Sequence, residues 1–247
     1  MVARPHATAD AGDAAASRVY AQHGNQRADL RNPASVAQLI SRSPQLGDGS
    51  LSADRRCGTA AIFNGMLMSG DPAASARGIR AVAATVDREA TARMEADFRR
   101  DGLSGADLRM ALQVSPSVIS PEADAALRRM ESGRLSPREA ATLQDTLFSI
   151  GMSRHYSGDA HPTGLSRREL EPLMRDLASN GAFGASTVTL HNRYEPNSDA
   201  LHWTVSTTPP GGTPLHADSW PAADGQGTVR PGGPTGRYQA DITIRPD

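Results

Sequence analysis

Apolar and polar residues follow two different periods along this chain of 247 residues. Between about residue 32 and residue 180, apolar side chains recur every three or four positions, as on one face of an α-helix. Beyond Asn180-Gly181, short segments alternate apolar and polar residues, as the strands of a half-buried sheet do. Helices followed by strands with turn sequences between them predict an α+β fold with an antiparallel sheet.

Capping residues mark where the helices of the first part begin. Asn32-Pro33 pairs an N-cap with the residue favoured at the first helical position. Pro72 opens a long amphipathic segment that is predicted to be helical to about residue 100. Three further starts lie at Ser120, Ser136 and Ser166, and the last two are capping boxes with a glutamate three residues later. Residues 72–180 are therefore predicted to be wholly helical.

The segment from Asp54 to Ser69 differs from the other helical segments because it has almost no polar face. Its large side chains are Ile62, Phe63, Met66, Leu67 and Met68. A helix that is apolar on all sides is predicted to be buried. Gly70-Asp71-Pro72 ends it.

Three segments after residue 180 are predicted to be strands, namely 187–190, 201–206 and 240–244. In the second, alternation is expected to place His202, Thr204 and Ser206 on the wetter side of the sheet. A Pro-Pro-Gly-Gly turn at 209–212 follows the second segment, so residues 214–220 are predicted to fold back on it as a hairpin. Folding about the middle of this turn places Asp218 opposite the neighbourhood of His202.

Domain boundaries follow from the distribution of large apolar side chains. Residues 1–31 contain almost none and are predicted to form a disordered tail, which serves either as an uncleaved secretion signal or as a terminus without a role. Residues 32–247 are predicted to form a single domain. Within it, 32–180 are mainly helical, with a helical insertion, and 181–247 form the sheet.

Charge and cysteine content narrow the classes of function. The chain has 26 basic and 27 acidic residues and a formal net charge of -1, so nothing suggests nucleic acid or an anionic membrane as its partner. A single cysteine excludes an internal disulfide and a cysteine-cluster metal site, and no cofactor is predicted. No apolar run is long enough to span a bilayer, and Met1 to Ala34 lack the apolar region of a secretory signal peptide.

All 26 basic residues are arginine. Codon bias in a GC-rich genome is one explanation. A lysine-free surface also offers no ubiquitin acceptor, which would suit a toxin that works inside a eukaryotic cell. On that hypothesis the protein is secreted or translocated into a target cell without a cleaved signal peptide; otherwise it is cytoplasmic.

Cys57 lies at the start of the predicted buried helix. The first helical turn presents unpaired N–H groups and a partial positive charge, which favour a thiolate over a thiol. A lone cysteine is commonly a small core residue, and a lone strand histidine commonly lies at the surface. His202 and Asp218 change this interpretation, because the predicted hairpin supplies a base and a carboxylate to orient it.

This order of residues resembles the papain-like cysteine peptidase superfamily, and most of all its bacterial effector and toxin members with a Cys-His-Asp triad. In that superfamily the cysteine opens the central helix, and the histidine and an asparagine or aspartate come from a following antiparallel sheet. Asp218-Ser219-Trp220 is similar to the superfamily's Asn-Ser-Trp. The resemblance implies a papain-like fold in which Cys57 is the nucleophile, His202 its base and Asp218 the orienting residue. It also implies that Ser219 and Trp220 lie around them, with Trp220 shielding the His–Asp contact from water.

Other residues fit this pattern less well. The superfamily's oxyanion-hole glutamine lies shortly before the cysteine, whereas here the nearest upstream glutamine is Gln45, which could serve only with a longer connection. His216 lies two residues before Asp218 and is the rival base. A loop with His155, Asp159 and His161 has a spacing that could suit a metal, but a polar loop explains it and no metal site is assigned.

The triad predicts a cysteine hydrolase that attacks amide bonds of protein substrates through a thioester intermediate. Both a protease and a glutamine deamidase would use this chemistry. An acyltransferase of the transglutaminase type is an alternative with the same triad. A non-catalytic helical protein that binds a partner is the alternative outside the enzymes.

Overall fold

The structure is a computed structural model that describes residues 6–43, 57–113, 117–155, 165–193 and 202–219, together with 222–245 apart from 223, 225 and 235–237. Its helices are α1 (His6–His23), α2 (Pro33–Ser41), α3 (Cys57–Met68), α4 (Pro72–Arg100), α5 (Gly105–Leu112), α6 (Pro121–Glu131), α7 (Pro137–His155) and α8 (Arg167–Ser179). Its strands are β1 (Ala28–Asp29), β2 (Arg134–Leu135), β3 (Thr187–Arg193), β4 (His202–Thr208), β5 (Leu215–Asp218), β6 (Thr228–Pro231) and β7 (Tyr238–Ile244). The helices precede the larger sheet, which confirms the predicted α+β class.

The predicted helix starts are confirmed by their caps. The Asn32 side chain accepts the backbone N–H groups of Ala34 and Ser35 at the start of α2. At the start of α7, the Glu139 carboxylate accepts the Ser136 N–H, and the Ser136 hydroxyl accepts the Glu139 N–H. Each such cap satisfies N–H groups that a helix leaves unpaired at its first turn, so the sequence signal has a direct physical cause.

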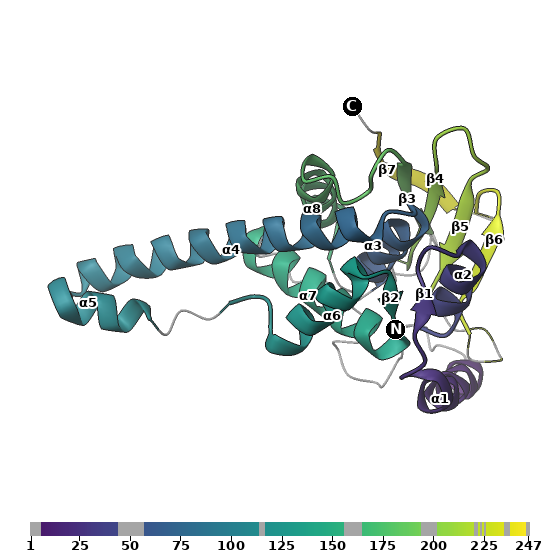
Figure 1. The fold of residues 1–247 in the computed structure, drawn as a ribbon, viewed down its shortest axis with the longest axis horizontal. Coiled ribbons are helices and arrows are strands. Elements are labelled where there is room, and N and C mark those ends of the chain that lie inside the picture. The colour runs from purple at the N-terminus through teal and green to yellow at the C-terminus, as the bar shows by residue number, and fades with distance from the viewer. Residues whose placement is uncertain are drawn as a thin grey trace.

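The larger sheet has the strand order β6-β5-β4-β3-β7, and every neighbouring pair is antiparallel. β4 and β5 form the predicted hairpin, with Val205 opposite Ala217 and Thr207 opposite Leu215. β3 lies on the other side of β4, and its pairing with β7 shifts register between Leu190 and His191. In Figure 1 these strands gather at one end of the molecule, with α3 beside them.

α3 is the buried helix expected from the sequence, since every residue from Cys57 to Met68 is buried. It packs on β4, and Gly65 allows the close approach: a Cβ built there would lie 3.0 Å from a Val188 methyl and 3.1 Å from a Val205 methyl. The Thr207 hydroxyl donates to the Gly65 carbonyl at 3.3 Å. Close packing and this hydrogen bond fix the helix along the strand.

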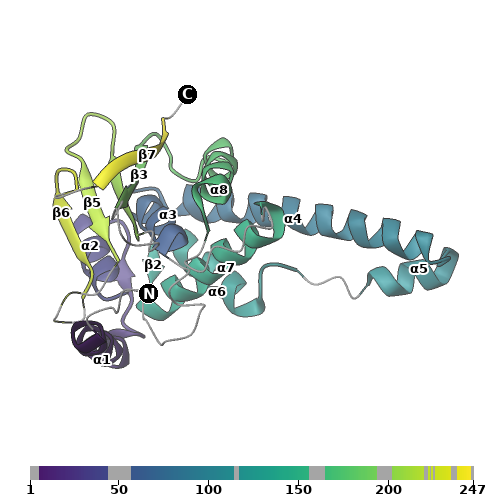
Figure 2. The ribbon, with the colours of Figure 1, turned by 180° about the vertical axis from the view of Figure 1, so that it is seen from behind.

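α4 and α5 form an arm that extends away from the rest of the chain, as both ribbon views show (Figures 1 and 2). The first half of α4 is anchored in the core through residues such as Ile79, Val82 and Val86. Beyond them α4 buries no further residue, and α5 buries only Leu108. Met110 of α5 is 63% exposed, and it is the only exposed large hydrophobic side chain in the described part of the chain.

Two sequence predictions differ from the structure. The stretch 1–31 was expected to be a disordered tail, but within it α1 spans His6–His23 and β1 spans Ala28–Asp29. Ala15 and Ala16 are buried, so this alanine-rich segment combines high helix propensity with small side chains that pack closely. Residues 72–180 were expected to be wholly helical, but β2 interrupts them and pairs with β1.

Substituting Gly78 by alanine should destabilise the fold by about 1–3 kcal/mol, because overpacking forces a well-packed contact apart. A Cβ built at Gly78 in α4 would lie 2.6 Å from the Cβ and 3.0 Å from the Cα of Ala182. Urea unfolding measures the loss. Gly233→Ala is the control, since a Cβ there meets nothing within 4 Å, and equal effects of the two variants would contradict the close contact.

Candidate active site

Cys57 is the first residue of α3 and is 2% exposed. Its position at the helix start brings the first-turn N–H groups and the positive end of the helix dipole to the sulfur. Burial keeps competing water away from this charge, so the dipole acts on the thiol more strongly than it would at a wet surface. The helix therefore supplies one half of the environment that a nucleophilic cysteine needs.

His202 and Asp218 come from the two strands of the hairpin. His202 begins β4 and Asp218 ends β5, so the antiparallel pairing brings them to the same end of the hairpin. The His202 Nε2–H donates to Asp218 Oδ1 at 2.8 Å. The side chains are 13% and 24% exposed, so this contact is partly shielded from water.

Cys57 acts on His202 as well, since its side chain is among the groups that raise the pKa of His202. Because Nε2 is bonded to Asp218, the buried Nδ1 is the ring nitrogen that remains for the thiol. The imidazole thus lies between the cysteine and the carboxylate. The structure brings together all three residues that the sequence analysis named as a triad.

Two opposing effects act on the pKa of His202. Burial acts to lower its pKa, but the hydrogen bonds to Asp218 and Cys57, and the negative charges of both, raise the pKa from 6.5 to about 9. At neutral pH the proton therefore resides on the imidazole. A cationic imidazole next to a cysteine sulfur is the arrangement that nucleophilic catalysis at the sulfur requires.

Ser219 connects the hairpin to the nucleophile helix. It follows Asp218 in the chain, is buried, and accepts a hydrogen bond of 2.8 Å from the side-chain amide of Asn64 in α3. This contact joins the end of β5 to the helix that begins with Cys57. Ser219 therefore ties the residue after Asp218 to α3. No sequence signal pointed to Asn64, because its polar side chain stands in an otherwise apolar helix.

Several candidate residues lie outside the described part of the chain. Trp220 and Gln45 are among them, so the proposed shield and the proposed oxyanion donor stay predictions. The same holds for Asp159 and His161 of the polar loop. Across the described ranges, no group of three or more His, Cys, Asp or Glu side chains could hold a metal ion. None of the helices in those ranges is both long enough and apolar enough to cross a membrane.

The rival base, His216, belongs to a different buried cluster. Its Nδ1 lies 3.1 Å from the Ser206 hydroxyl, which in turn lies 2.9 Å from Nε2 of His191. Burial, followed by the positive charges of His191 and Arg230, lowers the pKa of His216 to about 4. His216 is therefore neutral at physiological pH. The geometry places His202, and not His216, against Cys57.

This cluster corrects one expectation. Alternation along β4 suggested that His202, Thr204 and Ser206 face the wetter side of the sheet. Thr204 is fully buried and Ser206 is 8% exposed, so this side of the sheet is not wet at its centre. Within this buried polar face the Ser206 hydroxyl bridges His191 and His216 by hydrogen bonds.

The two histidines should give the free energy of unfolding a maximum near pH 6.5. His216 has a pKa of about 4 when folded, so from pH 4 to 6.5 the unfolded chain binds the extra proton and stability rises with pH. His202 has a pKa of about 9 when folded, so its stabilisation is complete below pH 6.5 and is lost as pH rises through 9. Each limb is on the order of 3 kcal/mol, and urea unfolding across this range measures both.

Matched variants assign the two limbs. His216→Gln should reduce the rise of stability between pH 4 and 6.5, part of which remains because burial also lowers the pKa of His191. His202→Gln should remove the fall of stability above pH 6.5. An alkaline limb that persists in His202→Gln would show that the raised pKa belongs to another group.

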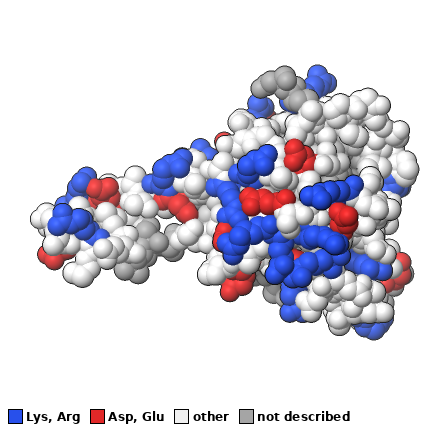
Figure 3. Space-filling view, viewed as in Figure 1, with Lys and Arg blue, Asp and Glu red and all other residues white. Residues whose placement is uncertain are grey.

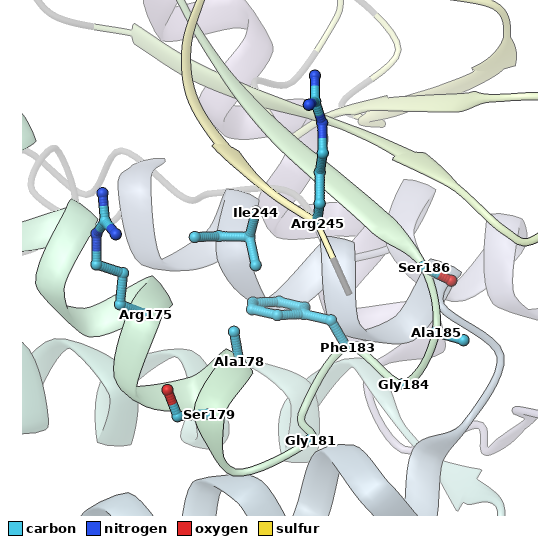
Figure 4. Close-up of a pocket in the computed structure, with 10 residues that line it drawn as sticks. All are labelled: Arg175, Ala178, Ser179, Gly181, Phe183, Gly184, Ala185, Ser186, Ile244 and Arg245. Atoms are coloured by element: carbon cyan, nitrogen blue, oxygen red, sulfur yellow. The ribbon is translucent and has the colours of Figure 1, made fainter. Parts of the chain in front are cut away.

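A pocket of about 590 Å³ lies apart from the triad, between the C-terminal end of α8 and the start of β3 (Figure 4). Phe183 and Ile244 form an apolar wall, and the side chains of Arg175 and Arg245 extend from the rim. β3 begins opposite the end of β4, whereas His202 is the first residue of β4. None of the triad residues lines this pocket, so it is not part of the candidate active site.

Comparison with known proteins identifies no relative: no family model, no curated protein and no solved structure matches the chain. The candidate active site therefore stands on its own geometry, which is a buried cysteine at a helix start, a cationic histidine and a carboxylate on one hairpin.

Proposed function

We propose that the protein is a cysteine hydrolase that attacks amide bonds of protein substrates through a thioester at Cys57. The observation that carries this proposal is the position of His202, which contacts both Cys57 and Asp218 and has a pKa raised to about 9. A merely structural buried histidine is held neutral by burial, as His216 is. Retaining a buried imidazolium beside a sulfur has its clearest use in nucleophilic catalysis.

The proposed reaction has two steps. In the first, the Cys57 thiolate attacks the carbonyl carbon, the C–N bond breaks, and the His202 imidazolium gives its proton to the leaving amine or ammonia. In the second, water attacks the thioester carbon while His202 accepts a proton from the water. The C–S bond then breaks, which releases the carboxylic acid product and restores the thiolate with its imidazolium partner.

Asp218 keeps the imidazole in the orientation that both steps need. Its carboxylate fixes Nε2 as a hydrogen-bond donor, which directs Nδ1 to the sulfur. Its negative charge also stabilises the imidazolium. The backbone N–H of Cys57, at the start of α3, is one proposed donor to the oxyanion, and Gln45 is proposed as the second.

The papain-like resemblance supports a protein substrate. A buried helix that opens with the cysteine packs on an antiparallel sheet, and the sheet supplies the histidine first and the carboxylate second along the chain. Peptide-bond cleavage and glutamine deamidation are the two proposed reactions. The lysine-free composition supports a bacterial effector or toxin as the biological setting.

Covalent labelling tests the nucleophile. Iodoacetamide at pH 6 should alkylate Cys57 faster in the wild type than in His202→Ala, with the rate followed by intact mass. The smaller side chain of this variant opens space around the buried sulfur. A purely steric effect would therefore make alkylation faster in the variant than in the wild type. Faster labelling of His202→Ala would therefore contradict the proposal.

Product analysis separates the reactions. Denatured casein supplies both peptide bonds and glutamine side chains, and hydroxylamine intercepts an acyl-enzyme as a hydroxamate. Fragments indicate a protease, ammonia with intact chains indicates a deamidase, and hydroxamate in excess of hydrolysis indicates acyl transfer. The Cys57→Ala variant is the blank for all three.

A further inference from the structure

Arginine side chains gather on one face of the molecule around the small β1–β2 sheet (Figure 3). We call the exposed residues Arg27, Arg31, Arg129, Arg134 and Arg138 the arginine surface. They come from β2 and from the segments that adjoin it in the fold: the ends of β1, the end of α6 and the start of α7. Their proximity is therefore produced by tertiary structure, since Arg27 and Arg138 are far apart in the chain.

Specific contacts hold these side chains together. Arg27 Nη2 and Arg129 Nε lie 3.1 Å and 2.9 Å from the same oxygen of Glu139. The Arg31 side chain lies beside Gly133, where a Cβ would come within 3.3 Å of its Nε. Arg138 stacks over the Tyr20 ring, with 5.7 Å from the guanidinium carbon to the ring centroid.

The arginine surface concentrates positive charge in a chain that has a formal net charge of -1. The segments that carry it also contain Asp29, Glu131 and Glu139, so five arginines stand against three carboxylates, of which Glu131 pairs with Arg80 of α4. Arg31, Arg134 and Arg138 form no ion pair within the described ranges. Three guanidinium groups are thus available to a negatively charged partner.

We propose that the arginine surface binds an acidic peptide segment of a partner protein. Glu139 shows that this surface can bind a carboxylate, because Arg27 and Arg129 both form ion pairs with it. The planar guanidinium fork matches the carboxylate group, and the stacked Arg138 loses less conformational freedom when it binds than a free side chain would. This inference is independent of the thioester chemistry at Cys57.

A lipid or nucleic acid surface fits less well. The single exposed large apolar side chain in the described ranges, Met110, lies in α5 on the arm, so the arginine surface has no apolar anchor for a membrane. Asp29 and Glu139 are interspersed among the arginines and would repel a continuous phosphate backbone. A peptide with separated carboxylates avoids both of them.

The test uses a fluorescein-labelled peptide of alternating glutamate and glycine, with the glutamine analogue as its neutral control. Fluorescence anisotropy should show binding of the full-length chain to the acidic peptide alone, and this binding should weaken as NaCl is raised. Arg31→Glu/Arg134→Glu should weaken it at least about tenfold, because like charges then face the peptide. Circular dichroism confirms that the variant is folded.

A charge-matched variant on the arm makes the test specific. Arg100→Glu/Arg109→Glu changes the net charge equally but lies on α4 and α5, and it should leave the affinity within about twofold. Equal losses in the two variants, or no binding to the acidic peptide, would overturn the proposal. So would tighter binding to phosphatidylserine vesicles or to polyuridylate than to the peptide.

Discussion

Cys57→Ala should lower the rate of amide hydrolysis by at least about 10⁴-fold, because removing the nucleophile from a catalytic triad leaves only the contributions of binding and oxyanion stabilisation. His202 and Asp218 keep each other in place without the sulfur, through the Nε2–Oδ1 hydrogen bond of 2.8 Å. The variant should therefore retain substrate binding while turnover is lost. The measurement is kcat/KM on the substrate that the casein assay selects, together with the binding constant of the variant.

Ser69→Ala is the control for this substitution. Ser69 follows the other end of α3, where its hydroxyl bonds to the Met66 carbonyl, so it tests a general loosening of the helix without touching the triad. Its activity should remain within about twofold of wild type, as expected for a partly exposed site away from the chemistry. Cys57→Ala with more than about a hundredth of wild-type activity would exclude Cys57 as the nucleophile.

Asp218→Ala should reduce kcat/KM by about 10²–10⁴-fold, whereas Asp218→Asn, which keeps an acceptor for the His202 Nε2–H, should reduce it less. Alanine removes both the acceptor for the His202 Nε2–H and the negative charge that helps to raise the pKa of His202 to about 9. Asparagine keeps an acceptor oxygen in the same place and removes only the charge. The two variants therefore separate the orienting role of Asp218 from its electrostatic role.

The pH profile of kcat/KM distinguishes an electrostatic role of Asp218 from a loss of activity caused by misfolding. The imidazolium that protonates the leaving group is lost as pH rises through about 9, so wild-type activity should fall along that limb. In Asp218→Asn the limb should move to lower pH, because the pKa of His202 falls when the neighbouring charge is removed. A reduced rate with an unmoved limb would indicate that Asp218 serves only to stabilise the hairpin.

Much of the site could be predicted because its signals are local. The caps at Asn32 and Ser136, the apolar helix that begins at Cys57, and the Pro-Pro-Gly-Gly turn each reflect physics that acts within a few residues. The turn fixes the hairpin register, and the register in turn brings Asp218 to His202. Two short-range signals were therefore enough to predict a long-range contact.

The remaining features depend on tertiary contacts that no local pattern encodes. The strand β2 forms only because β1, distant in sequence, pairs with it. The buried state of Thr204 and Ser206 depends on what covers that side of the sheet, so alternation alone indicated a wet face and was wrong. The position of β7 beside β3 likewise could not be predicted, because the same strand sequences are compatible with several strand orders.

The strand order determines when the parts of the candidate site become available during synthesis on the ribosome. α3, with its cysteine, is synthesised well before β4 and β5, and β3 receives its outer partner only when β7 has been made. Closing such long loops is the slow part of folding a mixed domain. Cys57 therefore emerges from the ribosome before His202 and Asp218. Under the proposed function, a newly made chain would stay inactive until β4 and β5 have docked beside α3.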